Sequence, residues 1–263
     1  MKQTQKFTPA ALTLSVLTAV LAESVPQSIS VRRALGTGAL GAGCLCILSA
    51  LAAAALRNRL PSREIKAALT AAFFLELLQT IGQAQRVCVE EFSSMALLGF
   101  LPLLLWAGWR VRPSGWNAPA RVLWWFAAFG GVVCLLGLGG QMHWYRLLEQ
   151  PAEATGHVWL TPVYAEYFAL PVLCSVQSAR RIVWLPAWSF LLQAAVLLSG
   201  ALLFGRSSYP QQELLRVWST GSFSRMDALL LLVWLLCAVY RIAVLSASIR
   251  LLWQPQAETE VQP

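Results

Sequence analysis

Charged residues are scarce in this sequence. They make up 12% of its 263 residues, whereas apolar residues make up 57%. Ordinary soluble domains carry roughly 25% charged residues, and so sparse a set of ionised groups cannot keep a chain of this size in solution. The composition therefore excludes an ordinary soluble domain and favours a protein that lies in a lipid bilayer.

Histidine and the usual catalytic and metal-binding spacings are lacking as well. The two histidines are His143 and His157, and the six cysteines are scattered, mostly inside apolar runs, without a CxxC pair. This pattern disfavours a disulfide framework, a structural zinc site and a catalytic Cys/His pair. No HExxH, GxSxG or phosphate-loop spacing occurs either. We therefore expect a protein that is not an enzyme and that binds neither a metal nor another cofactor.

Acidic charge is in the minority, and the net charge is +8. The 20 Lys and Arg residues sit singly or in pairs at the ends of apolar segments rather than in one patch. Residues in such places anchor and orient transmembrane helices, whereas a nucleic-acid-binding face needs a contiguous basic surface. The distribution predicts a lipid bilayer as a partner and no nucleic acid.

Long uncharged runs define the expected architecture. Four of them approach or exceed the roughly 20 residues that a helix needs to cross a bilayer, and a spanning segment must satisfy its own backbone as a helix. The fold class expected is all-α, a polytopic membrane bundle of about eight transmembrane helices. The expected spans are 7–22, 34–56, 67–85, 92–109, 122–142, 158–179, 182–205 and 228–249.

The two ends of the chain carry separate expectations. The first span follows Lys2 and Lys6 and ends in Val-Leu-Ala at 20–22, so it is either a transmembrane helix or a signal peptide with its cleavage site. At the other end, residues 254–263 are short, polar and acidic, which predicts a disordered tail after a single transmembrane domain over 1–253. With the N-terminus inside, twelve basic residues fall on the inner side and seven on the outer side. This bias predicts that both termini lie in the cytoplasm.

One face of the third expected span is polar. Glu76, Thr80 and Gln83 are spaced i, i+4 and i+7, and Gln79 lies beside them, so they share one side of a helix. A carboxylate at this depth points into the bundle or into a wet cavity. It either handles a substrate or a proton, or it joins helices through hydrogen bonds, and the sequence leaves both open.

The sixth expected span carries a second polar group. Tyr164, Glu166 and Tyr167 come just before Pro171, and proline removes a backbone donor and clashes with the preceding turn, so we expect this helix to be kinked or broken. Broken helices surround the binding sites of many transporters, although a kink can also serve packing alone. Arg241 lies well inside the last span, where it either reaches the interface or pairs with a buried carboxylate such as Glu76 or Glu166.

A longer motif runs from the segment after the seventh expected span into the last span. Its residues are Tyr209, Pro210, Arg216, Gly221, Phe223, Arg225, Asp227, Trp234 and Arg241. In type and order they resemble the B-subunit family of spore germinant receptors (the GerAB type). The spacing from Gly221 to Arg225 is one residue tighter than in the family pattern.

The resemblance implies the amino acid/polyamine/organocation transporter superfamily and a ten-helix fold similar to the leucine transporter. It also implies a role in sensing small germinants in the inner membrane of a spore, together with other receptor subunits. Two departures from the family are visible. The sequence ends after the helix that contains Trp234, and the first span carries Ala22-Glu23-Ser24 where the superfamily has a glycine-rich break. We therefore expect a truncated leucine-transporter-like fold.

Three functions are compatible with these features. The first is a receptor subunit that recognises a small polar germinant, such as an amino acid, and contributes to spore germination. Its cavity would be lined by Glu76, Gln79, Thr80, Gln83, Tyr164, Glu166 and Tyr167. The second is a proton- or sodium-coupled amino acid permease, for which an intramembrane carboxylate is equally useful. The third is a degenerate scaffold subunit of a membrane complex.

Overall fold

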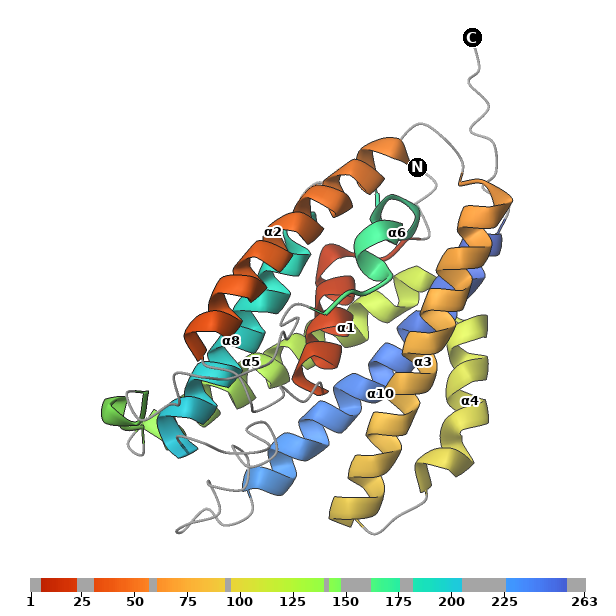
Figure 1. The fold of residues 1–263 in the computed structure, drawn as a ribbon. Coiled ribbons are helices and arrows are strands. Elements are labelled where there is room, and N and C mark those ends of the chain that lie inside the picture. The colour runs from red at the N-terminus through yellow and green to blue at the C-terminus, as the bar shows by residue number, and fades with distance from the viewer. Residues whose placement is uncertain are drawn as a thin grey trace.

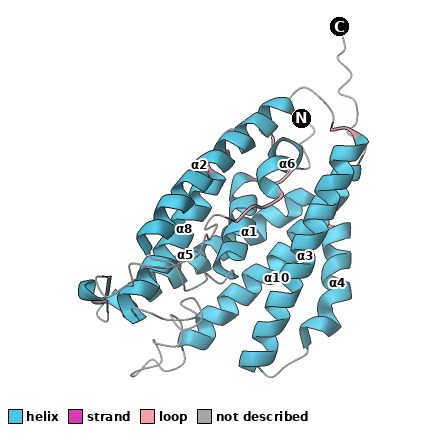
Figure 2. Ribbon diagram, viewed as in Figure 1, coloured by secondary structure: helices cyan, strands magenta, loops and turns pink. Residues whose placement is uncertain are grey.

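Helices form all the regular structure that is described. The computed structural model describes residues 6–22, 31–56, 61–92, 96–139, 142–147, 162–175, 182–204 and 226–254, and in these residues every regular element is helical (Figure 2). The α-helices are α1 (Pro9–Ala22), α2 (Val31–Ala55), α3 (Arg63–Phe92), α4 (Ala96–Arg110), α5 (Asn117–Gly139), α6 (Glu166–Leu173), α8 (Leu185–Phe204) and α10 (Met226–Trp253). Two short 3-10 turns, η1 (Pro113–Trp116) and η2 (Trp144–Leu147), follow α4 and α5. The predicted all-α class is confirmed for this part of the chain.

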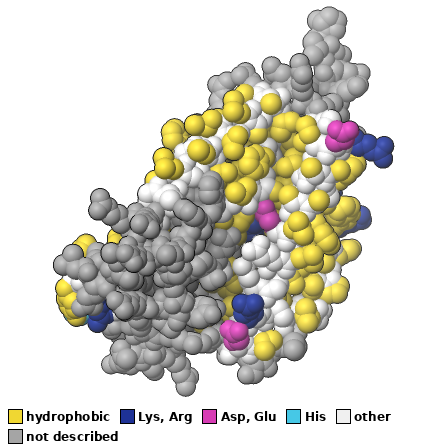
Figure 3. All heavy atoms as spheres, viewed as in Figure 1, with side chains coloured by type: hydrophobic (Ala, Val, Ile, Leu, Met, Phe, Trp, Pro, Cys, Tyr) yellow, Lys and Arg dark blue, Asp and Glu magenta, His cyan; other side chains and the backbone are white. Residues whose placement is uncertain are grey.

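Four helices are long and apolar enough to cross a membrane. They are Ala34–Ala55 in α2, Arg63–Glu90 in α3, Leu185–Leu203 in α8 and Leu229–Trp253 in α10. Large hydrophobic side chains on the outside of these helices are exposed, and they cover much of the face in Figure 3. A surface of this kind is stable in lipid and unstable in water. The chain is thus a multi-pass membrane protein, as its composition predicts.

The short helix α1 occupies the centre of the bundle (Figure 1). It contacts α10, α5 and α8, while α2 packs on α8, and both α3 and α4 pack on α10. Leu12, Val16 and Val20 of α1 are fully buried. Pro9 is its first residue, a position where the missing N–H of proline costs nothing. Because α1 contacts α10, α5 and α8, its residues are placed to meet side chains from several helices.

One end of the bundle gathers basic residues. Trp253 Nε1 donates to Thr70 Oγ1 at 2.9 Å, Arg250 donates to the carbonyl of Trp109, and Thr8 N donates to Asn117 Oδ1 at 2.9 Å. These contacts bring the C-terminal ends of α4 and α10 together with the N-terminal ends of α1, α3 and α5. We call this the basic end, after the residues Lys6, Arg63, Lys66, Arg110, Arg112, Arg121 and Arg250. All seven belong to the set that the sequence assigns to the inner side.

The sixth span is shorter than predicted. A helical span was expected over 158–179, kinked or broken near Pro171, and within residues 162–175 the helix runs only from Glu166 to Leu173. Eight residues cover roughly 12 Å, too little to cross a bilayer. Cys174 is extended, with φ −115° and ψ 169°, and Pro171 lies in the last turn. Lys6 Nζ donates to the carbonyls of Pro171 and Cys174, each at 3.2 Å, so tertiary contacts satisfy backbone groups at this end.

Candidate functional site

Arg241 lies in the core of the bundle. It is near the middle of α10, its relative exposure is 1%, and its helix neighbours Tyr240 and Ile242 are buried too. An ionised group at this depth is stable only if other groups replace the water that it has lost. Helix α10 contacts α1, α3 and α6, and each of these supplies a partner.

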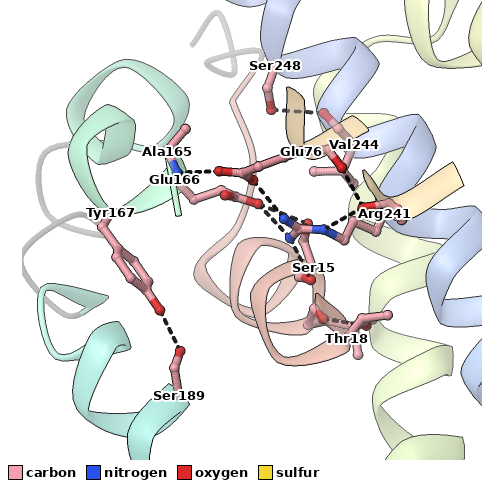
Figure 4. Close-up of polar contacts among 12 residues, drawn as sticks. Ser15, Thr18, Glu76, Ala165, Glu166, Tyr167, Ser189, Arg241, Val244 and Ser248 are labelled. Carbon is pink, nitrogen blue, oxygen red and sulfur yellow. Dashed lines mark hydrogen bonds and ion pairs between the residues drawn. The ribbon is translucent and has the colours of Figure 1, made fainter. Parts of the chain in front are cut away.

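Two glutamates from different helices pair with Arg241. Nη2 lies 2.7 Å from Glu76 Oε2 on α3, and Nη1 lies 2.7 Å from Glu166 Oε1 at the start of α6 (Figure 4). The side chain of Glu166 is fully buried, and that of Glu76 is 12% exposed. Arg241 therefore pairs with both carboxylates that the sequence offered as alternatives, and its guanidinium does not reach toward the membrane surface.

Hydroxyl, carbonyl and aromatic groups surround the rest of the guanidinium. Nη1 donates to the carbonyl of Ser15 at 2.8 Å and to Ser15 Oγ at 3.1 Å, and Nε donates to Thr80 Oγ1 at 3.3 Å. Thr80 lies one turn after Glu76, so one face of α3 provides both groups. The Tyr164 ring centroid lies 5.2 Å from the guanidinium carbon, within cation–π range. Arg241 thus joins α1, α3 and α6 to α10.

Glu76 also holds the start of α6. Its Oε1 accepts a hydrogen bond of 2.6 Å from the backbone N–H of Ala165, the residue just before the helix. The first N–H groups of a helix have no partners within it, and they attract negative charge. One carboxylate therefore fixes both the guanidinium of Arg241 and the N-terminal end of α6.

Tyr167 links α6 to α2 and α8. Its hydroxyl lies 2.8 Å from Ser189 Oγ on α8 and is bonded to it, as Figure 4 shows. Ser49 on α2 donates to the carbonyl of Tyr167 at 2.9 Å. Any displacement of α6 away from Arg241 would act on α2 and α8 through these two bonds.

The cluster contains one more acid than base. One guanidinium faces two carboxyl groups, and Glu166 Oε2 is buried without a hydrogen-bond partner among the residues that the structure describes. The other three carboxyl oxygens of Glu76 and Glu166 each accept a hydrogen bond. A buried acceptor without a donor is unfavourable. Glu166 Oε2 is therefore the atom at which the cluster is incomplete.

The structure brings some of the predicted site residues together at Arg241 and leaves others away from it. Glu76, Thr80, Tyr164 and Glu166 meet at Arg241. Tyr167 is fully buried and its hydroxyl is bonded to α8. Gln79 is exposed on α3 and Gln83 is half-buried, and neither is bonded to Arg241. Helical spacing alone does not separate Thr80 from its neighbour Gln79, because both lie close to the Glu76 face.

Ser15 is a site residue that the sequence pattern does not single out. It is fully buried in α1, but a serine in an apolar helix more often bonds its own backbone. Thr18 does so, since its hydroxyl donates to the carbonyl of Leu14 at 2.7 Å. The only signal for Ser15 is a hydroxyl at the depth of Arg241, which hydropathy does not resolve.

The residues of the family motif lie mostly outside the described residues. Tyr209, Pro210, Arg216, Gly221, Phe223 and Arg225 fall there, and so does the side chain of Asp227 in the first turn of α10. Trp234 is described, and its Nε1 donates to the carbonyl of Thr18 on α1 at 3.4 Å. This bond strengthens the contact between α10 and α1 that carries Arg241.

The charged side chains of the Arg241 cluster contact one another, and a pocket of about 340 Å³ lies away from them, where α1 meets α5. Its lining residues are Thr8, Ala10, Asn117, Arg121, Trp124 and Trp125. Arg121 is the one charged residue among them, so the pocket lacks the paired acid and base that distinguish the Arg241 cluster.

Comparison of the chain with protein-family models, with curated proteins and with solved structures found no match. The family resemblance therefore rests on the residues quoted from the sequence. What the structure supports is an all-helical, multi-pass membrane protein with a buried Arg241–Glu76–Glu166 cluster.

Proposed function

We propose that this chain is a non-enzymatic membrane subunit that senses a small polar germinant, such as an amino acid, within a spore germinant receptor. The observation that carries the sensing proposal is the buried cluster of Arg241, Glu76 and Glu166. Its placement in spore germination is supported by the sequence motif around Asp227 and Trp234 alone.

An amino acid carries the same two kinds of ionic group as the cluster. Its α-carboxylate can take the place of a glutamate on Arg241, whose planar guanidinium fits a carboxylate with two donors. Its α-ammonium can then pair with the glutamate that has been displaced. Glu76 is 12% exposed. This exposure supports access to the cluster from outside the bundle.

Exchange of ion pairs at this place would act on helix positions. Glu76 holds Ala165 at the start of α6, and Tyr167 connects α6 to α8. A ligand that binds Arg241 or Glu76 more tightly in one arrangement of α6 shifts the population toward that arrangement. Partner subunits of the receptor would respond to this shift.

We propose that the chain lies in the cytoplasmic membrane or in the inner membrane of the spore, with both termini in the cytoplasm. The basic end supports it, because cytoplasmic ends of membrane helices carry an excess of Lys and Arg. Among described residues, the opposite end of the bundle holds Arg32 and Arg33 at the start of α2, Arg86 near the end of α3 and Arg146 in η2, four against the seven of the basic end.

An ion-coupled amino acid permease remains the second candidate. The short helix α6, which starts at a buried carboxylate, supports it because broken helices with ionisable groups also form the substrate sites of secondary transporters. Uptake distinguishes the two functions, since a permease moves labelled amino acid into sealed vesicles and a sensor only binds it.

The test is binding of a panel of labelled amino acids to the purified chain in lipid nanodiscs. We expect at least one amino acid to bind, and Arg241→Lys to weaken it by roughly tenfold or more because the two-donor fork is lost. Glu90→Gln is the matched control, since Glu90 is an exposed carboxylate on the same helix as Glu76, and it should bind like the wild type. Absence of binding for the whole panel would favour the scaffold function instead.

A further inference from the structure

Within the described part of the chain, the charged groups that face the cluster are few, and each can be assigned to an element. Helix α3 contributes Glu76, α6 contributes Glu166 and α10 contributes Arg241. The segment before α6 contributes the phenol of Tyr164, and α1 contributes only the neutral Ser15. With both carboxyl groups ionised, the cluster would carry one uncompensated negative charge in the core, which is strongly unfavourable.

Hydrogen bonding points to the same imbalance. Glu76 uses both oxygens as acceptors, one from Ala165 N–H and one from Arg241, and Glu166 Oε1 accepts from Arg241 and Ser15. Of the four carboxyl oxygens, Glu166 Oε2 alone lacks a partner among the described residues. The two carboxyl groups are neighbours, because they bind Nη2 and Nη1 of the same guanidinium. A proton on Glu166 Oε2 would turn this unpaired acceptor into a donor toward Glu76.

We propose that Glu76 and Glu166 hold one proton between them, carried on Glu166 Oε2 and donated to the Glu76 carboxylate. The guanidinium of Arg241 then balances the one carboxylate charge that remains, and every oxygen of the pair has a partner. Two carboxyl groups that share a buried site commonly retain one proton in this way.

A consequence follows that rests on the proposed function. The amino acid is a zwitterion, so its α-ammonium and α-carboxylate together add no net charge to the cluster. Loss of the proton would leave the occupied cluster with one uncompensated negative charge, so the proton stays in it. Ligand binding would therefore take place with no net release of protons.

The geometry separates the two glutamates. In Glu166→Gln the amide oxygen can accept from Arg241 while the amide N–H donates to Glu76 as the proposed O–H does. In Glu76→Gln the amide nitrogen must face either Ala165 N–H or Arg241, donor against donor. We therefore expect Glu166→Gln to melt close to the wild type and Glu76→Gln to melt at a clearly lower temperature.

The deciding measurement is infrared spectroscopy of the chain in lipid membranes, without ligand. We expect a C=O stretching band of a protonated carboxyl group in the wild type, at neutral pH, that shifts in D₂O. The band should be absent in Glu166→Gln and retained in Glu90→Gln, whose side chain is exposed. A wild-type spectrum without the band, or a band that persists in Glu166→Gln, overturns the proposal.

The count of protons exchanged on binding then separates this inference from the proposed function. Calorimetry in two buffers of different ionisation enthalpy gives this count, and we expect no net release for the wild type. Release of about one proton for each amino acid bound would contradict the retained proton. If the band is present and no amino acid binds, the proton site stands and the sensing function fails. If an amino acid binds and the wild type lacks the band, sensing stands and the shared proton is wrong.

Discussion

At the scale of single residues, Arg241 determines which helices meet in the core. Its guanidinium bonds groups on α1, α3 and α6, so none of these helices can shift along α10 without breaking a charge-assisted bond. Helical spacing predicted that Glu76 and Thr80 share a face, and the depth of Arg241 predicted a carboxylate partner. The sequence did not predict that Glu76 and Glu166 both pair with Arg241, because spacing along one helix says nothing about which other helix lies opposite.

Removal of the charge on Arg241 should destabilise the fold. Arg241→Met keeps the length of the side chain but leaves two carboxyl groups in the core without a cation, which costs about 3–5 kcal/mol. We expect a large fall in the midpoint of thermal unfolding in detergent, followed through tryptophan fluorescence.

Arg110→Met is the control for this change, since Arg110 is exposed at the end of α4. Its midpoint should stay near that of the wild type. Equal midpoints for Arg241→Met and Arg110→Met would show that the cluster does not hold the core together.

At the scale of elements, α4 and α10 approach closely through a glycine. A side chain at Gly108 would place its Cβ 2.8 Å from the carbonyl oxygen of Ala243 and 2.8 Å from Ser246 Cβ. Ser246 Oγ also donates to the carbonyl of Leu105 at 3.2 Å. Small residues at such contacts allow membrane helices to pack on each other's backbones.

Substitution of this glycine should force the two helices apart. Gly108→Ala adds one methyl group against backbone atoms that cannot rotate away, and we expect a loss of about 1–3 kcal/mol in unfolding free energy. The measurement is the midpoint of thermal unfolding in detergent. Gly99→Ala tests the same change on the same helix, where nothing lies within 4 Å of the added Cβ; if it lowers the midpoint as much, close packing is not the cause.

The length of α6 shows where prediction from the sequence stops. Hydropathy predicted the long helices because 20 or more apolar residues in a row leave few other structures in lipid. Residues 158–179 are comparably apolar, yet α6 begins where Glu76 accepts the N–H of Ala165 and ends just after Pro171. Pro171 is visible in the sequence, whereas the bond from Glu76 arises only from the packing of α3 against α6.

At the scale of the whole molecule, the direction of the helices follows the distribution of basic residues. The N-terminal ends of α1, α3 and α5 and the C-terminal ends of α4 and α10 meet at the basic end. At the other end, His143 N, just before η2, donates to the carbonyl of Leu202 near the end of α8 at 3.1 Å. These contacts agree with the alternation of helices that the sequence predicts.

Tag accessibility tests this orientation. An epitope inserted at Arg112, at the basic end, should be reached by antibody only after the cytoplasmic membrane is made permeable. The same epitope inserted at His143 should be reached in intact cells with the outer face exposed, because positive residues favour the cytoplasmic side. A tag in the 254–263 tail should behave like the one at Arg112, and the reverse pattern for all three would invert the proposed topology.

The bond between Ser15 and Arg241 joins residues that are 226 positions apart. During synthesis α1 is made early and α10 comes last among the helices described here. Glu76 and Glu166 therefore enter the bilayer well before the guanidinium that balances them has left the ribosome. Until that moment no guanidinium from α10 balances them in the bilayer, and an unbalanced carboxylate is unfavourable there. Insertion of α10 is thus itself a step in assembly, because it brings the cation that Glu76 and Glu166 share.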